Sequence, residues 1–169
     1  MKKHMLPVIF AVCALMFGVS ALARSGSPKA FQSFGDTLAP APTADPSGST
    51  RADLAEEVVC LVNAERARQG LRSLRVDADL TRAARIRAGE LTLAFGHIRP
   101  DGSPWDTVSA IARGENIARG QNSAAKVMAA WVTSSTGHRE NILRPSYGSI
   151  GVCAYRSGGI LYWVQLFGR

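Results

Sequence analysis

The chain has 169 residues, a formal net charge of +7 at neutral pH and 46% hydrophobic residues. A basic balance often indicates an anionic partner such as nucleic acid. Here the arginines are scattered and no basic–aromatic motif of the usual kinds occurs, so we expect no nucleic-acid binding. Several arginines, among them Arg66 and Arg87, fall on helical patterns interleaved with alanine, and we expect them on a solvated surface.

The first 23 residues have the three-part pattern of a secretory signal peptide. A short basic start precedes an apolar run from Met5 to Val19, and small residues at Ala21 and Ala23 predict cleavage after Ala23. The apolar run is shorter than the roughly 20 residues that span a bilayer, although an uncleaved anchor is the alternative. Residues 1–23 therefore predict a secreted or periplasmic protein with no membrane span in the mature chain.

The next segment, residues 24–52, has the composition of a disordered linker. It is rich in Ser, Pro, Ala, Gly and Thr and has few large apolar residues. Such a segment buries too little surface to offset the entropy of ordering it. One folded domain is therefore expected over residues 53–169.

Two long helices are predicted at the start of this domain. Asp53 and Glu56 resemble a capping box, apolar residues then recur at helical spacing, and Gly70 marks the end. An aspartate at position 77 or 79 begins a second helix that runs to Leu91.

Two further helices follow after a turn. Residues 103–106, Ser-Pro-Trp-Asp, predict a short helix, and Asn122 or Ser123 begins another. The apolar face of the latter carries Trp131, which we expect in the core.

The end of the chain changes from helical to strand periodicity. Residues 150–156 and 160–167 are β-rich and are joined by Ser-Gly-Gly, which predicts a hairpin. Both runs are apolar at odd and even positions alike. A sheet covered on both faces, and hence flanked by helices, is therefore expected.

Three residues in turn-rich segments are candidates for chemistry: His97, Glu115 and His138. Imidazole and carboxylate groups bind zinc or transfer protons near neutral pH. Separations of 18 and 23 residues carry no metal-site specificity by themselves. From the residues alone, three separate loop side chains that make local hydrogen bonds remain the alternative.

Five segments occur in an order that resembles a known family: "LVNAERARQGL", "FGHIRPDGS", "GENIARG", "AWVTSSTGHRENIL" and "IGVCAY" with "YWVQLFG". They are similar to the CAP superfamily of cysteine-rich secretory, antigen 5 and pathogenesis-related proteins, also called the SCP domain, and especially to its small bacterial secreted branch. The resemblance covers about residues 55–168. It implies an α+β fold, a three-layer α–β–α sandwich.

The same resemblance implies a central cleft. His97 matches the first histidine of the family, Glu115 the glutamate of the "GEN" motif and His138 the second histidine. Some members bind zinc or another divalent metal through the two histidines. Many eukaryotic members carry a second acid where this chain has Ser134. Glu140 lies nearby in the sequence but does not match that motif, so a triad is expected rather than a tetrad.

Several classes of function are compatible with this resemblance. A monomeric binding module in the cell envelope or outside the cell, with a lipid or an envelope polymer as partner, is the first hypothesis. A zinc-dependent hydrolase is the alternative, with a metal-activated water held by His97 and His138 and with Glu115 as base or third ligand. A structural envelope domain tethered by its linker is the third. A serine nucleophile at Ser134 or Ser135 is disfavoured, because Ser commonly ends helices.

The cysteines predict a disulfide. Cys13 leaves with the signal peptide, and Cys60 and Cys153 then form an even pair in an exported domain, on elements expected to touch. Two small buried thiols in an apolar core are the alternative.

Overall fold

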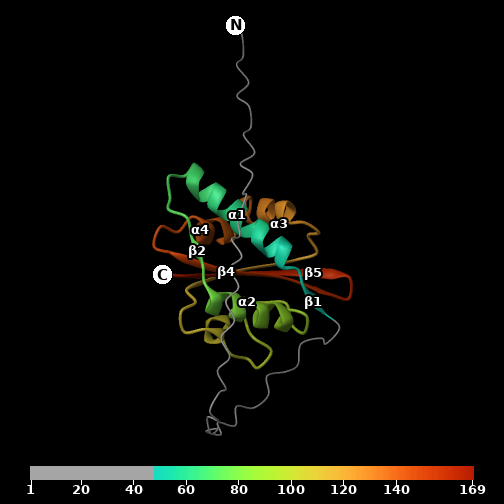
Figure 1. The fold of residues 1–169 in the computed structure, drawn as a ribbon. Coiled ribbons are helices and arrows are strands. Elements are labelled where there is room, and N and C mark those ends of the chain that lie inside the picture. The colour runs from blue at the N-terminus through green and yellow to red at the C-terminus, as the bar shows by residue number, and fades with distance from the viewer. Residues whose placement is uncertain (1–47) are drawn as a thin grey trace, which may run out of the picture. The chain divides into compact units, whose positions relative to one another are not determined.

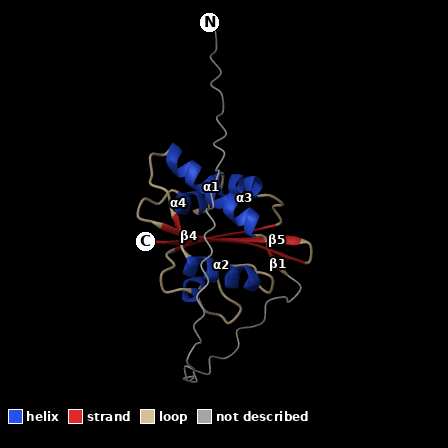
Figure 2. Ribbon diagram, in the orientation of Figure 1, coloured by secondary structure: helices blue, strands red, loops and turns tan. Residues whose placement is uncertain are grey.

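The computed structural model describes residues 48–169. The predicted signal peptide and most of the predicted linker lie outside the described residues. The described part has three layers, with α1, α3 and α4 on one face of a five-stranded sheet and α2 on the other (Figures 1 and 2). The three-layer α–β–α sandwich expected from the sequence is therefore confirmed.

The sheet is built around one long hairpin. Its strands are β1 (Ser49–Thr50), β2 (Arg75–Val76), β3 (Gly114–Arg119), β4 (Ser149–Ser157) and β5 (Ile160–Gly168). The order is β1-β4-β5-β3, with all pairs antiparallel, and β2 pairs parallel with β4. The β4–β5 turn places Gly158 and Gly159 at φ of 54° and 79°, as a type I′ turn requires. The predicted hairpin is correct, and β3 lies at an edge of the sheet.

Three helices cover one face: α1 (Ala52–Arg68), α3 (Ala124–Val132) and α4 (His138–Ile142). The capping box predicted for α1 is wrong, because Asp53 lies inside the first turn and pairs with Arg51 instead of capping the helix. The end of α1 is correct, since Gly70 adopts φ of +69° just beyond it. Ser123 caps α3 by accepting from Lys126 N, as its sequence position predicts.

The opposite face is covered by α2 (Ala78–Glu90) and by the short 3₁₀ helix η1 (Trp105–Val108). Asp77 caps α2 by accepting hydrogen bonds from Asp79 N and Leu80 N. The helix approaches β4 so closely that a Cβ added to Gly151 would lie 2.1 Å from the Leu80 carbonyl carbon. Only glycine fits there, so the spacing between this helix and the sheet depends on Gly151.

Both faces of the central hairpin are buried, as expected from its continuous apolar pattern. Trp131, Trp163 and Phe167 lie in the core on the α1–α3 side. Leu80, Leu91 and Leu166 lie in the core on the α2 side.

The predicted disulfide between Cys60 and Cys153 is wrong. Cys60 is exposed on α1, whereas Cys153 is buried in β4 among the side chains that face α2. Since α1 packs on the other face of the sheet, the two thiols lie on different sides of β4. Burial raises the pKa of Cys153 to about 12, so its thiol stays protonated at physiological pH.

Three short elements fall where the sequence analysis expected loops or linker. β3 contains the "GEN" motif, α4 begins at His138, and Ser49–Thr50 of the predicted linker pairs with β4. Within residues 48–169, no helix has the length and apolarity needed to cross a membrane.

Trp131 lies in the core, as predicted from the apolar face of its helix. Its side chain is 1% exposed, and its indole N–H donates to the carbonyl oxygen of Ile117 at 3.2 Å. That carbonyl belongs to the edge strand β3. Trp131 therefore packs the core and also supplies a hydrogen bond to the edge of the sheet.

Replacing Trp131 by alanine should lower the free energy of unfolding by about 3–5 kcal/mol, because it removes a large buried ring and leaves the Ile117 carbonyl without its donor. Trp131→Phe keeps most of the packing and should cost less. Urea unfolding measures both values. A loss below about 1 kcal/mol for Trp131→Ala would show that the ring is not part of the core.

Candidate functional site

A cleft of about 480 Å³ lies at the start of β3. Its walls come from the loop after α2, from η1, from β3, and from α4 with the loop that follows it. His97, Glu115 and His138, the three residues selected from the sequence, all line it. The complete lining is His97, Trp105, Arg113, Gly114, Glu115, Thr136, Gly137, His138, Glu140, Asn141, Arg144, Ser146, Tyr147 and Arg169.

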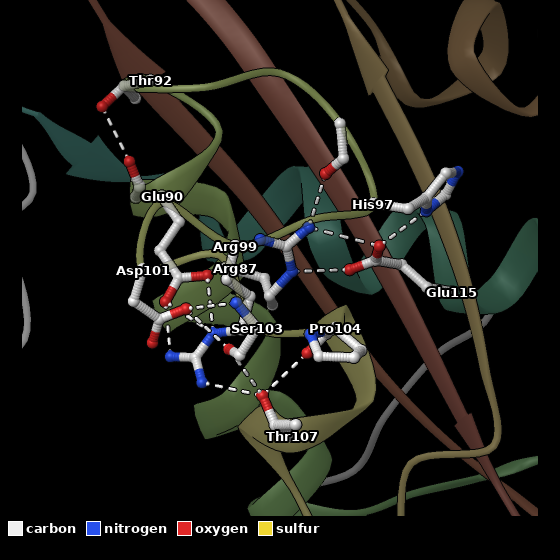
Figure 3. Close-up of polar contacts among 12 residues, drawn as sticks. Arg87, Glu90, Thr92, His97, Arg99, Asp101, Ser103, Pro104, Thr107 and Glu115 are labelled. Atoms are coloured by element: carbon white, nitrogen blue, oxygen red, sulfur yellow. Dashed lines mark hydrogen bonds and ion pairs between the residues drawn. The ribbon is translucent and has the colours of Figure 1, made fainter.

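Glu115 is held between a buried arginine and His97 (Figure 3). Arg87 donates from Nε to Glu115 Oε2 at 2.8 Å and from its terminal nitrogen to Oε1 at 3.3 Å. His97 Nδ1 lies 2.8 Å from the same Oε1. Because an ionised carboxylate can only accept, Nδ1 of His97 is the donor in this contact.

Arg87 also joins Glu115 to a second buried carboxylate. It donates to Glu90 Oε2 at 2.8 Å, and Arg99 donates to Glu90 Oε1 at 2.6 Å. Burial by itself lowers the pKa of Arg87, but hydrogen bonds and charges from Glu115 and Glu90 outweigh it and raise the pKa. We call Arg87, Glu90, Arg99 and Glu115 the ion cluster. It contains two cations and two carboxylates.

His138 stands at the first position of α4, after Gly137 with φ of 93°. Its Nδ1 lies 2.9 Å from Ser134 Oγ and 3.4 Å from Thr136 Oγ1. Ser134 is the residue found where the family resemblance led us to look for an acid. A hydroxyl can either donate or accept. Ser134 therefore does not fix the tautomer of His138 in the way that the Glu115 carboxylate fixes that of His97.

The pKa of His138 is lowered from 6.5. Burial is the largest cause, followed by the charge of His97, while Glu140 acts in the opposite direction. His138 is therefore uncharged at neutral pH.

Three buried or half-buried amides attach α4 to the sheet. Asn116 donates to His138 O and to Gln165 Oε1, both at 3.0 Å. Asn141 donates to Asn116 Oδ1 at 3.0 Å and to Glu115 O at 3.2 Å. We call Asn116, Asn141 and Gln165 the amide cluster. It fixes the backbone of His138 relative to that of Glu115.

Arg66 holds the loop that follows α4. It is 1% exposed, and its guanidinium donates to the carbonyls of Ile142 at 2.8 Å, Arg144 at 3.1 Å and Tyr147 at 3.4 Å. Arg144 and Tyr147 both line the cleft. A buried cation on α1 thus fixes the backbone of one wall of the cleft.

Sequence reasoning placed Arg66 and Arg87 on a solvated surface, and both are buried. An arginine interleaved with alanine on a helix gives the same sequence pattern whether its side chain is buried or exposed. The sequence carried no direct indication of a role for Asn116 or Asn141, although they lie inside the motifs "GENIARG" and "AWVTSSTGHRENIL". The position of each asparagine close to a candidate residue was the signal that could have identified it.

The predicted three-ligand zinc site does not fit this geometry. In the described part of the chain, no group of three or more His, Cys, Asp or Glu side chains could hold a metal ion. Glu115 uses both oxygens for Arg87 and His97, and His138 Nδ1 contacts Ser134. The two imidazole Nε2 atoms alone are fewer than the ligands that protein zinc sites use.

Comparisons with known proteins agree with the fold and the motifs. The model of the cysteine-rich secretory protein family, CAP, matches residues 59–167. The uncharacterized protein YkwD of Bacillus subtilis strain 168 is 41% identical over 120 residues, which are 66% of this chain and 46% of that protein. The family match covers most of the chain, so this chain belongs to the cysteine-rich secretory protein (CAP) family.

Solved structures show the same fold. An extracellular protein containing an SCP domain from Bacillus anthracis strain Ames gives a TM-score of 0.63 at 22% identity, over 70% of this chain and 41% of that one. An outer surface protein from Borrelia burgdorferi gives a TM-score of 0.61 at 18% identity, over 72% of this chain and 98% of that one. The chain spans less than half the length of the Bacillus proteins that it matches.

Replacing Arg87 by methionine should destabilise the fold by about 3–5 kcal/mol, because Glu90 and Glu115 would stay buried without the cation between them. The matched control is Arg82→Ala on the same helix, whose ion pair with Asp79 is exposed and should contribute less than about 1 kcal/mol. Urea unfolding of the two variants tests this. Equal losses would contradict a structural role for the ion cluster.

His138 should titrate below pH 6.5 in the folded protein. On acidification the unfolded chain binds this proton first, so His138 favours folding above about pH 6.5 and this contribution is lost as the pH falls through the folded-state pKa. Histidine NMR titration measures the pKa. His97→Ala should raise the pKa of His138 and Glu140→Gln should lower it. Shifts of the opposite sign would show that these two neighbours do not set the pKa.

Proposed function

We propose that this chain is an extracytoplasmic binding module whose cleft, lined by His97, Glu115 and His138, takes a polar ligand from the cell envelope or its surroundings. The observation that carries the proposal is the fixed arrangement of the polar groups in the cleft. The ion cluster orients His97 and the amide cluster positions His138. These side chains therefore lose little conformational freedom when a ligand binds. Pre-organised polar groups in a concave site are typical of binding sites.

The lining favours a polar ligand over a lipid tail. Trp105 and Tyr147 are the large apolar rings at the cleft, and the remaining lining residues are polar, charged or glycine. An acyl chain or a sterol would meet no aliphatic side chain there. Of the two partners considered from the sequence, an envelope polymer therefore suits the cleft better than a lipid does.

The cleft suits a zinc-dependent hydrolase less well than a binding module. That mechanism needs Glu115 as a base or ligand, and both of its oxygens are engaged by Arg87 and His97. The geometry thus favours recognition over metal-assisted chemistry.

Placement outside the cytoplasm is part of the proposal. It is supported by the signal-like residues 1–23 and by relatives described as extracellular or outer-surface proteins. The part of the predicted linker that precedes β1 would separate the domain from any point of attachment.

Retention on immobilised bacterial envelope polymers tests the binding function. His97→Ala/His138→Ala should reduce retention at least about tenfold, because both imidazole rings that line the cleft are lost. Arg82→Ala, exposed on α2 and absent from the cleft lining, serves as the matched control and should bind as wild type. Unchanged retention of the double variant, with wild-type thermal stability, would overturn the proposal.

A further inference from the structure

We propose that the group recognised in the cleft is an oxyanion, a phosphate or carboxylate carried by the ligand, and that Arg113 and Arg144 bind it. This inference rests on the proposed function and names the chemistry of its ligand. Guanidinium groups bind both oxyanions through paired N–H donors.

Arg113 stands just before β3 with its guanidinium partly fixed. One terminal nitrogen donates to Ala110 O at 2.9 Å and to Ala112 O at 2.7 Å. No ion pair to Arg113 occurs among the described residues, so its Nε and second terminal nitrogen are left for a ligand. The two carbonyl contacts hold the side chain without neutralising its charge.

Arg144 follows α4 and also lines the cleft. Its guanidinium carbon lies 5.5 Å from the centre of the Tyr147 ring, and its backbone carbonyl is held by Arg66. Within residues 48–169, its side chain makes no ion pair with a carboxylate. An aromatic face orients this cation while its N–H donors stay open to a ligand.

The acids at the cleft do not cancel these two charges. Glu115 belongs to the ion cluster, whose two arginines and two glutamates balance. Glu140 is the other acid in the lining, and no described cation pairs with it. With His138 uncharged at neutral pH, Arg113 and Arg144 outweigh Glu140, and the cleft attracts anions.

The test is titration of the purified exported protein with inorganic phosphate, methyl phosphate and acetate at constant ionic strength, followed by amide NMR. Glycerol is the neutral control. Saturable shifts near Arg113 and Arg144 with phosphate, with acetate or with both are expected, and the stronger ligand identifies the source of the oxyanion. No saturable shift with any of the three anions would overturn the inference.

Variants decide whether the two arginines are responsible. Arg144→Gln and Arg113→Gln should each weaken binding at least about fivefold, and Glu140→Gln should strengthen it about threefold because it removes the opposing charge. Arg119→Gln is the matched control: it removes an exposed arginine at the far end of β3 that stacks on Phe95 outside the cleft. Equal weakening by Arg119→Gln, or weaker binding by Glu140→Gln, contradicts the assignment.

The two proposals can fail separately. If envelope polymers are retained through His97 and His138 while phosphate and acetate do not bind, the oxyanion inference is wrong and the binding function stands. If the anions bind through Arg113 and Arg144 while no polymer is retained, the envelope assignment is wrong and the oxyanion site stands.

Discussion

Arg87 lies in the protein interior between two carboxylates, and the geometry of the cleft depends on this cation. It reaches from α2 to Glu115 on β3, to Glu90 on its own helix and to the carbonyl of Gly96 just before His97. A buried charge is tolerated only when its partners are also fixed. The requirement to neutralise Arg87 therefore fixes the side chain of Glu115, and Glu115 in turn orients His97.

The cleft has two walls that are organised by different chemistry. On the α2 side, charges set the position and tautomer of His97. On the α4 side, neutral amides fix the backbone. Asn116 donates to the carbonyl of His138, and Asn141 donates to that of Glu115. The two walls meet at the edge strand β3, which carries both Glu115 and Asn116. The same edge accepts a hydrogen bond from Trp131.

The two histidines are consequently not equivalent. His97 has a carboxylate at Nδ1 and is about half exposed, whereas His138 has a hydroxyl at Nδ1 and a lowered pKa. Serine at position 134 accounts for the missing carboxylate beside His138. With Glu115 neutralised by Arg87, the charges left at the cleft are those of its rim, where arginines predominate. This distribution fits recognition of an anionic group better than assembly of a metal site.

The sequence by itself determined the α2 and α3 helices, the terminal hairpin, its burial on both faces and the core position of Trp131, because these depend on local periodicity and turn chemistry. The motif resemblance selected His97, Glu115 and His138. Only the tertiary structure decided that Arg66 and Arg87 are buried, since their partners lie 28 or more residues away in the key contacts. It also separated Cys60 from Cys153, because strand register fixes which face of the sheet a side chain meets.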